Sequence, residues 1–377
     1  MEPVISTVPL MQLASGDELA LQLYRFVGTT PGKKVYLQSN LHGAELAGNA
    51  VIHRLIEWLS TLDADCLRGE IWLVPVCNPV GVNTRAHNFS SGRYNPYDGR
   101  DWNRIFWDYE QVAEDIPAFA QDYLEADPDA ILRAYRQEIL THFQEEVAAL
   151  TTPSGVAVHH LYSTRLQALM LDADYVIDLH TSGNRGMTYL YYCEGRAESA
   201  RLFGLDFAIW LDQYDGDAFD ESFMKPWIAL ERAFAQLGRE IRFDIEAFTL
   251  ELGTAMQFDW GSVERGLQGI QHYLNQKGVL EGVATLPIDA RETMLTRTSQ
   301  MTKYHAPAGG MIQSRVEPGT WVKAGTRLYS LLCFNKIGQL PQIKEIQAEH
   351  SGLVYDVAIN HSVNQGEYVL AILQPDA

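Results

Sequence analysis

The chain has 377 residues, of which 46% are hydrophobic and 20% charged, and its formal net charge is −19. This length exceeds what one compact core usually holds, so we expect one large domain and one smaller domain. The negative charge disfavours nucleic acid and anionic membranes as partners, but it does not exclude an anionic substrate in a locally cationic pocket.

The N-terminal segment and the cysteines bear on the cellular compartment. Residues 1–26 lack a basic start and a long apolar core, so no signal peptide is expected. Nowhere does an apolar run reach the roughly 18 residues needed to span a membrane. The four cysteines have no paired spacing; they are Cys66, Cys77, Cys193 and Cys333. We therefore expect reduced thiols in a cytoplasmic protein.

Apolar strands and amphipathic helices alternate from about residue 33 to residue 278. The pattern predicts strands at 33–40, 69–81, 172–183, 187–195 and 241–253, and helices at 51–59, 223–238 and 262–278. Such alternation indicates an α/β domain, here taken as residues 1–298, with a mixed, largely parallel sheet and helices on both faces.

Residues 105–165 interrupt this alternation with an acidic, helix-rich stretch. We interpret it as an insertion between strands that borders the pocket. Its histidines are candidate ligands, but surface or interhelix positions explain them more readily; they are His142, His159 and His160.

From residue 299 to residue 377, short strands and turns replace helices. A faint internal repeat aligns Gly310 with Gly352, Val322 with Val363 and Gly325 with Gly366. Paired halves of this kind resemble the barrel-sandwich fold of biotinyl and lipoyl carrier domains. The segment that joins the halves contains Lys336 and Lys344 but no carrier motif, so we expect a structural cap.

Polar side chains follow several of the predicted strands at the point where each strand ends. They are His42, Glu45, Asn78, His180 and Glu251. Ligands of open α/β sheets bind beyond the carboxyl ends of the strands. This shared position is the main sequence evidence for a functional site.

The two histidines of this set and Glu45 are candidate metal ligands. Zinc hydrolases commonly use three protein ligands and leave a fourth position for water. His42 and Glu45 can converge if the segment turns, and Gly43 would allow a tight bend. His180 can supply the third ligand, with Asp178 as a partner that orients a ligand histidine.

A cationic cluster lies between residues 93 and 104, within an acidic protein. It contains Arg93, Arg100, Asn103 and Arg104. Guanidinium groups bind carboxylates bidentately, which favours a binding site for a substrate carboxylate. The alternative is that surface arginines pair with Asp98 and Asp101.

Glu251 lies at the end of an apolar strand, two residues before Gly253. A partly desolvated carboxylate there would have a raised pKa and could accept a proton from water. Glu246 is the competing residue, but its alternation with Arg242 and Asp244 predicts that it faces solvent.

These motifs together resemble the succinylglutamate desuccinylase/aspartoacylase family, which is related to the zinc carboxypeptidases. The matching stretches are HGAE at 42–45, NP at 78–79, RYNPYDGRDWNR at 93–104, IDLH at 177–180 and ELG at 251–253. The resemblance covers residues 35–278, and the C-terminal segment resembles the family's β-rich domain. Trp102 replaces the family's leucine.

The resemblance implies specific roles. His42, Glu45 and His180 would bind one zinc ion, and Glu251 would act as general base and later as proton donor. Three further residues would contact the substrate. Arg93 would polarise the scissile carbonyl, and Asn103 and Arg104 would bind a substrate carboxylate. Arg85 and Arg100 remain alternatives to Arg93.

The resulting functional prediction is a zinc-dependent deacylase. It would cleave the amide bond of a small N-acyl amino acid or a related N-acyl amine. The alternative is a zinc carboxypeptidase that acts on short peptides. No nucleic-acid or membrane partner is expected, and the sequence leaves a homo-oligomer open.

Overall fold

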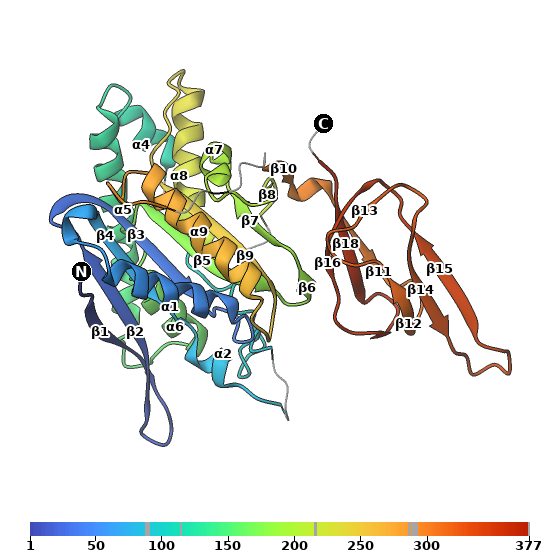
Figure 1. The fold of residues 1–377 in the computed structure, drawn as a ribbon. Helices are drawn as coiled ribbons and strands as arrows, with labels where there is room; N and C mark the ends of the chain where they lie inside the picture. Colours follow the sequence, from blue (N-terminus) through green and yellow to red (C-terminus); the bar gives the residue numbers. More distant parts are fainter. Residues whose placement is uncertain (87–90, 114, 215–216, 286–287, 289–292, 376–377) are drawn as a thin grey trace.

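The computed structural model describes residues 1–377 except 87–90, 114, 215–216, 286–287, 289–292 and 376–377. Its largest element is a nine-stranded sheet with the order β1-β2-β4-β3-β5-β9-β7-β8-β10 (Figure 1). These strands are β1 (Val4–Gln12), β2 (Glu18–Val27), β3 (Thr30–Ser39), β4 (Arg68–Val74), β5 (Tyr175–Ser182), β7 (Thr188–Tyr192), β8 (Phe207–Trp210), β9 (Glu246–Thr254) and β10 (Met294–Arg297).

The centre of this sheet is parallel. Strand β3 runs parallel to β4 and β5, and β5 runs parallel to β9, whereas β7 is antiparallel to β9. The hairpin of β1 and β2 extends the sheet with antiparallel pairing. The predicted mixed, largely parallel sheet is therefore confirmed. The hairpin was not predicted, because most residues of β1 are exposed or half-buried and give little apolar contrast.

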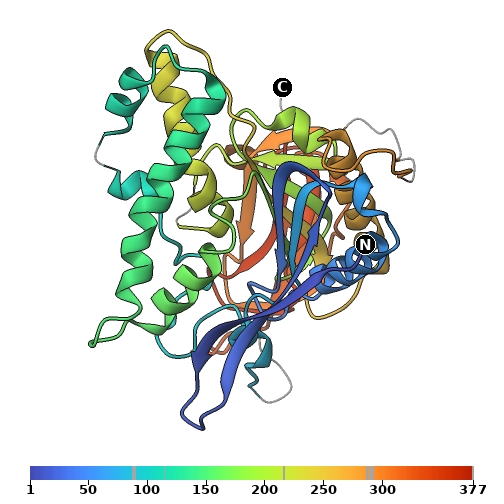
Figure 2. The ribbon, with the colours of Figure 1, turned by 90° about the vertical axis from the view of Figure 1, so that its left-hand side faces the viewer.

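Helices cover both faces of the sheet, as predicted. They are α1 (Ala47–Ser60), α2 (Pro79–Asn83), α3 (Tyr109–Val112), α4 (Ile116–Asp122), α5 (Pro128–Ala149), α6 (Val158–Gln167), α7 (Ala197–Arg201), α8 (Phe219–Gln236) and α9 (Trp260–Gln276). Val51 of α1 and Ile270 of α9 share one core with Leu37 of β3. Tyr135 of α5 and Trp227 of α8 belong to the core of the opposite face. In Figure 2 the sheet stands between these two helical layers.

The helix-rich segment 105–165 contains α3 to α6. Helices α3 and α4 contact α8, and α6 contacts β1, so the segment adds to the helical layer on one face. Across the described part of the chain, no helix combines the length and the apolar character needed to cross a membrane. All four cysteines are free thiols.

Two small antiparallel sheets, here called the C-terminal β module (residues 301–373), lie beside the large sheet (Figure 1). Their strands are β11 (Met301–His305), β12 (Gly310–Arg315), β13 (Trp321–Val322), β14 (Arg327–Cys333), β15 (Gln342–Gln347), β16 (Gly352–Val357), β17 (Ser362–Val363) and β18 (Tyr368–Leu373). Strand β6 (Arg185–Gly186), which follows β5, pairs with β16 and joins the two parts. The domain boundary at residues 298/299 stays a prediction.

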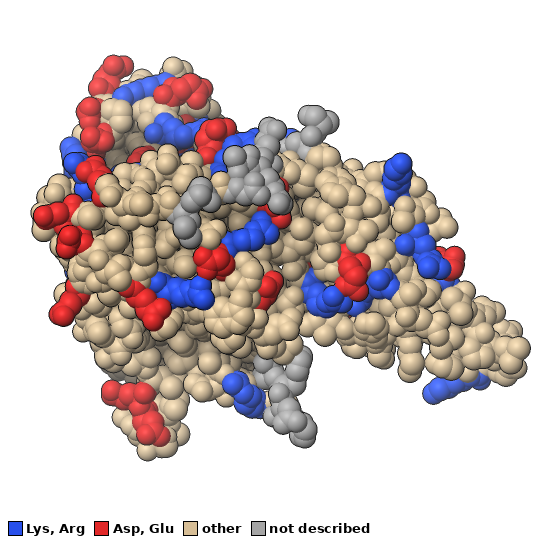
Figure 3. Space-filling model, viewed as in Figure 1, with Lys and Arg blue, Asp and Glu red and all other residues tan. Residues whose placement is uncertain are grey.

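Charged side chains are distributed unevenly on the surface. On the face drawn in Figure 3, acidic groups are scattered over the helical part, and the far end of the C-terminal β module is largely uncharged.

Candidate metal centre and active site

The loop after β3 brings its polar residues back toward the sheet. Asn40 adopts a left-handed conformation (φ +66°), which asparagine tolerates better than most residues. Its Nδ2 donates a hydrogen bond to the Glu45 carbonyl oxygen at 2.8 Å. Asn78 Nδ2, from the loop after β4, donates to the Leu41 carbonyl oxygen at 2.8 Å. Both bonds fix the turn that carries His42.

Three glycines allow neighbouring loops to touch at this point. A Cβ atom on Gly43 would lie 2.2 Å from the carbonyl oxygen of Gly81, and one on Gly92 would lie 2.2 Å from the same atom. The Gly43 N–H donates to the Gly92 carbonyl oxygen at 3.2 Å. Gly43 is therefore required for close backbone approach rather than for a positive φ.

His42, Glu45 and His180 meet at the carboxyl ends of β3 and β5. Glu45 Oε1 lies 2.9 Å from His42 Nδ1, and Glu45 Oε2 lies 2.8 Å from His180 Nδ1. One donor atom from each residue falls within 4.8 Å of the others, and each residue is only 3% exposed. The structure thus brings together the three residues that the sequence proposed as ligands.

A second carboxylate faces the far side of each imidazole. Asp101 Oδ1 lies 2.9 Å from His42 Nε2, and Asp178 Oδ2 lies 2.9 Å from His180 Nε2. A neutral imidazole has one N–H, yet each ring is flanked by carboxylates on both nitrogens. Each ring therefore needs either a second proton, carried on Nδ1, or a metal cation bound at Nδ1. Two imidazoles and one carboxylate form a donor set that suits a divalent metal.

The pKa values of these groups reflect the same charge distribution. Burial alone would lower the pKa of His180, but Asp178 and Glu45 raise it well above its usual value. Burial would raise the pKa of Glu45, but His42 and His180 hold it below its usual range. The site therefore keeps Glu45 ionised and favours positive charge between the three side chains.

Arg93 is the guanidinium that reaches this centre. Its Nη1 lies 3.3 Å from His42 Nδ1 and 3.9 Å from Glu45 Oε1, and its Nε donates to Asp101 Oδ2 at 2.9 Å. Asp101 also accepts the Asn103 N–H at 2.8 Å. In the sequence, Asp101 stands out only as the alternative ion-pair partner of surface arginines, because nothing in its spacing distinguishes it from Asp98.

The two alternatives to Arg93 lie elsewhere. Arg85 is exposed, and its Nη1 donates to the Thr84 carbonyl oxygen at 2.8 Å. Arg100 is also exposed, and its Nε lies 3.9 Å from Asp98 Oδ2. Among the described contacts, neither guanidinium touches His42, Glu45 or His180.

Asn103 and Arg104 follow Asp101 along the same loop. Asn103 is buried, and its Oδ1 accepts the N–H of Phe219 at 2.8 Å, at the first residue of α8. Arg104 is half-buried, and its Nη1 donates to the Asn103 carbonyl oxygen at 2.5 Å. Trp102 is fully buried and packs edge to face on Tyr162, with ring centroids 4.8 Å apart.

Glu251 lies near the end of β9 and is paired in register with His180 of β5. Its Oε2 is buried and has no hydrogen-bond partner among the described residues. Burial raises the pKa of Glu251 to about 8; Glu45 and Asp356 add to this effect, and His180 and Arg93 oppose it. A carboxyl group in this state can exchange a proton near neutral pH.

The expectation that Glu246 faces solvent is wrong. Glu246 is 6% exposed at the opposite end of β9 from Glu251. Its carboxylate accepts hydrogen bonds from Tyr273 at 2.6 Å, Ser199 at 2.6 Å and Lys277 at 3.1 Å. These partners come from two helices, α7 and the C-terminal end of α9, so the alternation of residues along the strand could not reveal them.

The histidines of the helical segment do not join the centre. Among the described contacts, His159 Nδ1 lies 2.8 Å from Asp98 Oδ2, and His160 Nε2 lies 3.2 Å from Glu146 Oε2. The ring of His142 packs against that of Tyr109 at 5.5 Å. They occupy the interhelix and surface positions that were expected.

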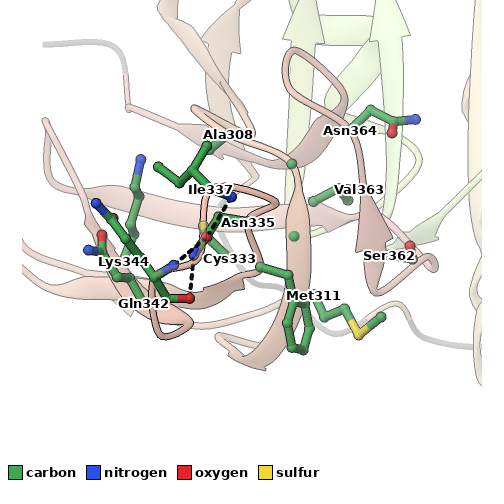
Figure 4. A pocket seen from close by; sticks show the side chains of 14 residues that line it. Ala308, Met311, Cys333, Asn335, Ile337, Gln342, Lys344, Ser362, Val363 and Asn364 are labelled. Atoms are coloured by element: carbon green, nitrogen blue, oxygen red, sulfur yellow. Dashed lines mark hydrogen bonds between the residues drawn. The ribbon is translucent and has the colours of Figure 1, made fainter.

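A hollow of about 670 Å³ lies in the C-terminal β module, away from the converging residues (Figure 4). Of the described residues that line it, Lys344 is the one with a charged side chain. Asn335 organises the adjacent hairpin, since its Oδ1 accepts the N–H groups of Ile337 and Gln339 at 3.2 Å each. The hollow holds no cluster of catalytic groups, so the site at the ends of β3, β5 and β9 remains the candidate.

Comparisons with known proteins identify the family to which the chain belongs. Residues 31–276 match the family model of the succinylglutamate desuccinylase/aspartoacylase catalytic domain. No curated protein matches the chain significantly. A crystal structure of a family protein from Shewanella amazonensis is 31% identical, with 98% of each chain covered and a TM-score of 0.88.

Two further solved structures extend the comparison. One from Shewanella frigidimarina is 29% identical, covers 99% of this chain and 98% of its own, and has a TM-score of 0.89. The product-bound ectoine utilization protein of Ruegeria pomeroyi is 16% identical, with 99% of this chain and 95% of its own covered and a TM-score of 0.68, and so shares the fold. The chain therefore belongs to the succinylglutamate desuccinylase/aspartoacylase family.

Proposed function

We propose that this protein is a zinc-dependent hydrolase that cleaves the amide bond of a small N-acyl amino acid or a related N-acyl amine. The observation that carries the proposal is the pair of imidazoles that share Glu45, each backed by a further carboxylate. In this proposal His42 Nδ1, His180 Nδ1 and the Glu45 carboxylate hold one zinc ion.

A bound zinc ion would supply Lewis acidity, which polarises a carbonyl group and lowers the pKa of water toward about 7. Glu251 accepts the proton of the attacking water and later delivers it to the leaving amine. Its pKa of about 8 in the described structure lies near neutrality, which suits a group that must both take up and release a proton.

Arg93 is proposed to donate hydrogen bonds to the scissile carbonyl oxygen. It lies beside His42 and Glu45, and its contact with Asp101 holds the guanidinium in place. Negative charge that develops on the oxygen in the transition state is stabilised by such a fixed donor, at about 3 to 4 kcal/mol for a well-placed one.

Asn103 and Arg104 are proposed to bind a carboxylate of the substrate. The Phe219 N–H engages Asn103 Oδ1, which leaves the Nδ2 donor side of the amide for a ligand. Arg104 adds a planar guanidinium next to it, and that geometry suits a carboxylate.

The C-terminal β module supports a preference for small substrates. Asp356 of β16 is buried and accepts hydrogen bonds from Asn184 at 3.1 Å and from Ser182, two residues after His180. The module is therefore attached directly beside the site and leaves less room for a long peptide.

A cytoplasmic location remains part of the proposal, consistent with four free thiols.

The test is a substrate screen with the zinc-loaded protein, using N-acetyl, N-succinyl and N-formyl amino acids alongside short peptides. We expect turnover of at least one N-acyl amino acid, loss of turnover with a chelator and recovery with zinc. Hydrolysis of peptides without turnover of any N-acyl amino acid would instead favour the carboxypeptidase alternative.

A further inference from the structure

A row of buried polar side chains continues behind His180, into the sheet. Tyr36 Oη donates to Gln38 Oε1 at 3.0 Å, and Gln38 Nε2 donates to Asp178 Oδ1 at 3.1 Å. Asp178 Oδ2 in turn lies 2.9 Å from His180 Nε2. Tyr36, Gln38 and Asp178 are each 0% exposed.

The sheet register explains how these groups meet. Strands β3 and β5 are parallel, with Gln38 paired to Asp178. Because side chains alternate along a strand, Tyr36 and Gln38 share one face of β3, and Asp178 and His180 share the same face of β5. That face otherwise belongs to an apolar core, in which the Tyr36 ring lies 6.1 Å from that of Phe219.

Each hydrogen bond of the row fixes the orientation of the next group. The Asp178 carboxylate can only accept, so the Gln38 NH₂ group must face it, and the amide oxygen then faces Tyr36, whose hydroxyl donates to it. The NH₂ group hydrogen-bonds to Asp178 Oδ1, so Asp178 Oδ2 is the oxygen that accepts from the imidazole. His180 then keeps its Nε2–H toward Asp178, and its Nδ1 lone pair points at the space beside Glu45.

We propose that Tyr36 and Gln38 are positioning residues that fix the tautomer and ring orientation of His180 for metal binding. The inference rests on the proposed function, because it presupposes the metal site of His42, Glu45 and His180. A buried polar chain that served packing alone could be replaced by apolar side chains of the same volume. This chain instead ends on a ring nitrogen of the metal centre.

The experiment compares Gln38→Leu and Tyr36→Phe with the wild-type chain. For each protein, the zinc dissociation constant is measured by competition with a chromophoric chelator, and the visible spectrum of the cobalt-substituted protein is recorded. We expect zinc affinity to fall about 10- to 100-fold in Gln38→Leu and less in Tyr36→Phe, with altered cobalt bands in both. Melting of the metal-free proteins checks the fold.

Tyr175→Phe is the matched control. Buried Tyr175 lies at the first residue of β5 and donates to Asp244 Oδ2 at 2.6 Å, so the variant removes the same kind of bond at the other end of the strand. It should lower stability but leave zinc affinity and the cobalt spectrum unchanged.

The outcomes separate this inference from the proposed function. If the wild-type chain binds no zinc, the proposed function fails. If the wild-type chain binds zinc and folded Gln38→Leu and Tyr36→Phe bind it equally well, only the positioning role is overturned. Tyr36→Phe, which removes a single oxygen atom, keeps the test decisive if Gln38→Leu does not fold.

Discussion

Glu251 and His180 lie side by side on the central parallel strands β9 and β5, paired in register toward the carboxyl ends of these strands. His180 is held by carboxylates on both ring nitrogens, whereas Glu251 Oε2 has no hydrogen-bond partner within the described part of the chain. An unpaired buried carboxyl oxygen is costly, and ionisable groups with a strongly shifted pKa are enriched at functional sites.

Glu251→Gln should abolish turnover and leave zinc in place. The amide keeps the shape of the side chain but cannot accept a proton, so kcat should fall by about 10² to 10⁴-fold or more. Zinc content by elemental analysis should stay at one ion per chain. Glu246→Gln changes the same residue type on the same strand, outside the site, and should retain activity; full activity in Glu251→Gln would remove that residue from the mechanism.

The raised pKa of Glu251 predicts how the stability of the metal-free protein depends on pH. Since the folded-state pKa of about 8 exceeds the usual 4.5, the folded state binds this proton more tightly than the unfolded state. The free energy of unfolding should therefore fall as pH rises between these values, by up to about 1.4 kcal/mol per pH unit from this group. Urea unfolding with a chelator should show a steeper fall with pH in the wild type than in Glu251→Gln, in which the raised pKa of His180 still contributes above its usual value. Equal slopes in the two proteins would contradict the shift.

Arg93→Ala should reduce kcat/KM by about 10² to 10³-fold, because it removes a donor to the developing oxyanion. Zinc content should be largely retained, since Arg93 is not a ligand. Arg100→Ala provides the comparison: its side chain is 58% exposed and pairs weakly with Asp98, so activity should not change. Loss of activity in Arg100→Ala with full activity in Arg93→Ala would reverse the assignment.

Asp101→Asn should weaken zinc binding by about 10- to 100-fold, because the amide no longer fixes the His42 ring through a charged partner. Arg93 would also lose its ion pair, so kcat should fall in parallel. The readout is zinc affinity by chelator competition. Asp98→Asn, which affects a contact with His159 instead, should bind zinc as the wild type does.

Much of this site could be predicted from sequence because the ligands follow strands with strong apolar patterns. His42 follows such a strand, and His180 and Glu251 lie near the carboxyl ends of two others. Neighbouring parallel strands place their carboxyl ends on the same side of the sheet. Asp101 could not be predicted, since its position depends on how the loop 93–104 folds back over His42. Glu246 was misjudged because burial by Tyr273 and Lys277 is a tertiary effect that strand alternation does not report.

The central claim is that His42, Glu45 and His180 bind one divalent metal ion. Anomalous diffraction at the zinc absorption edge, from crystals of the zinc-reconstituted protein, tests it most directly. The account predicts one strong peak per chain within coordination distance of His42 Nδ1, His180 Nδ1 and a Glu45 carboxylate oxygen. A fully reconstituted protein with no peak between these three side chains, or with its zinc bound elsewhere, would contradict the account.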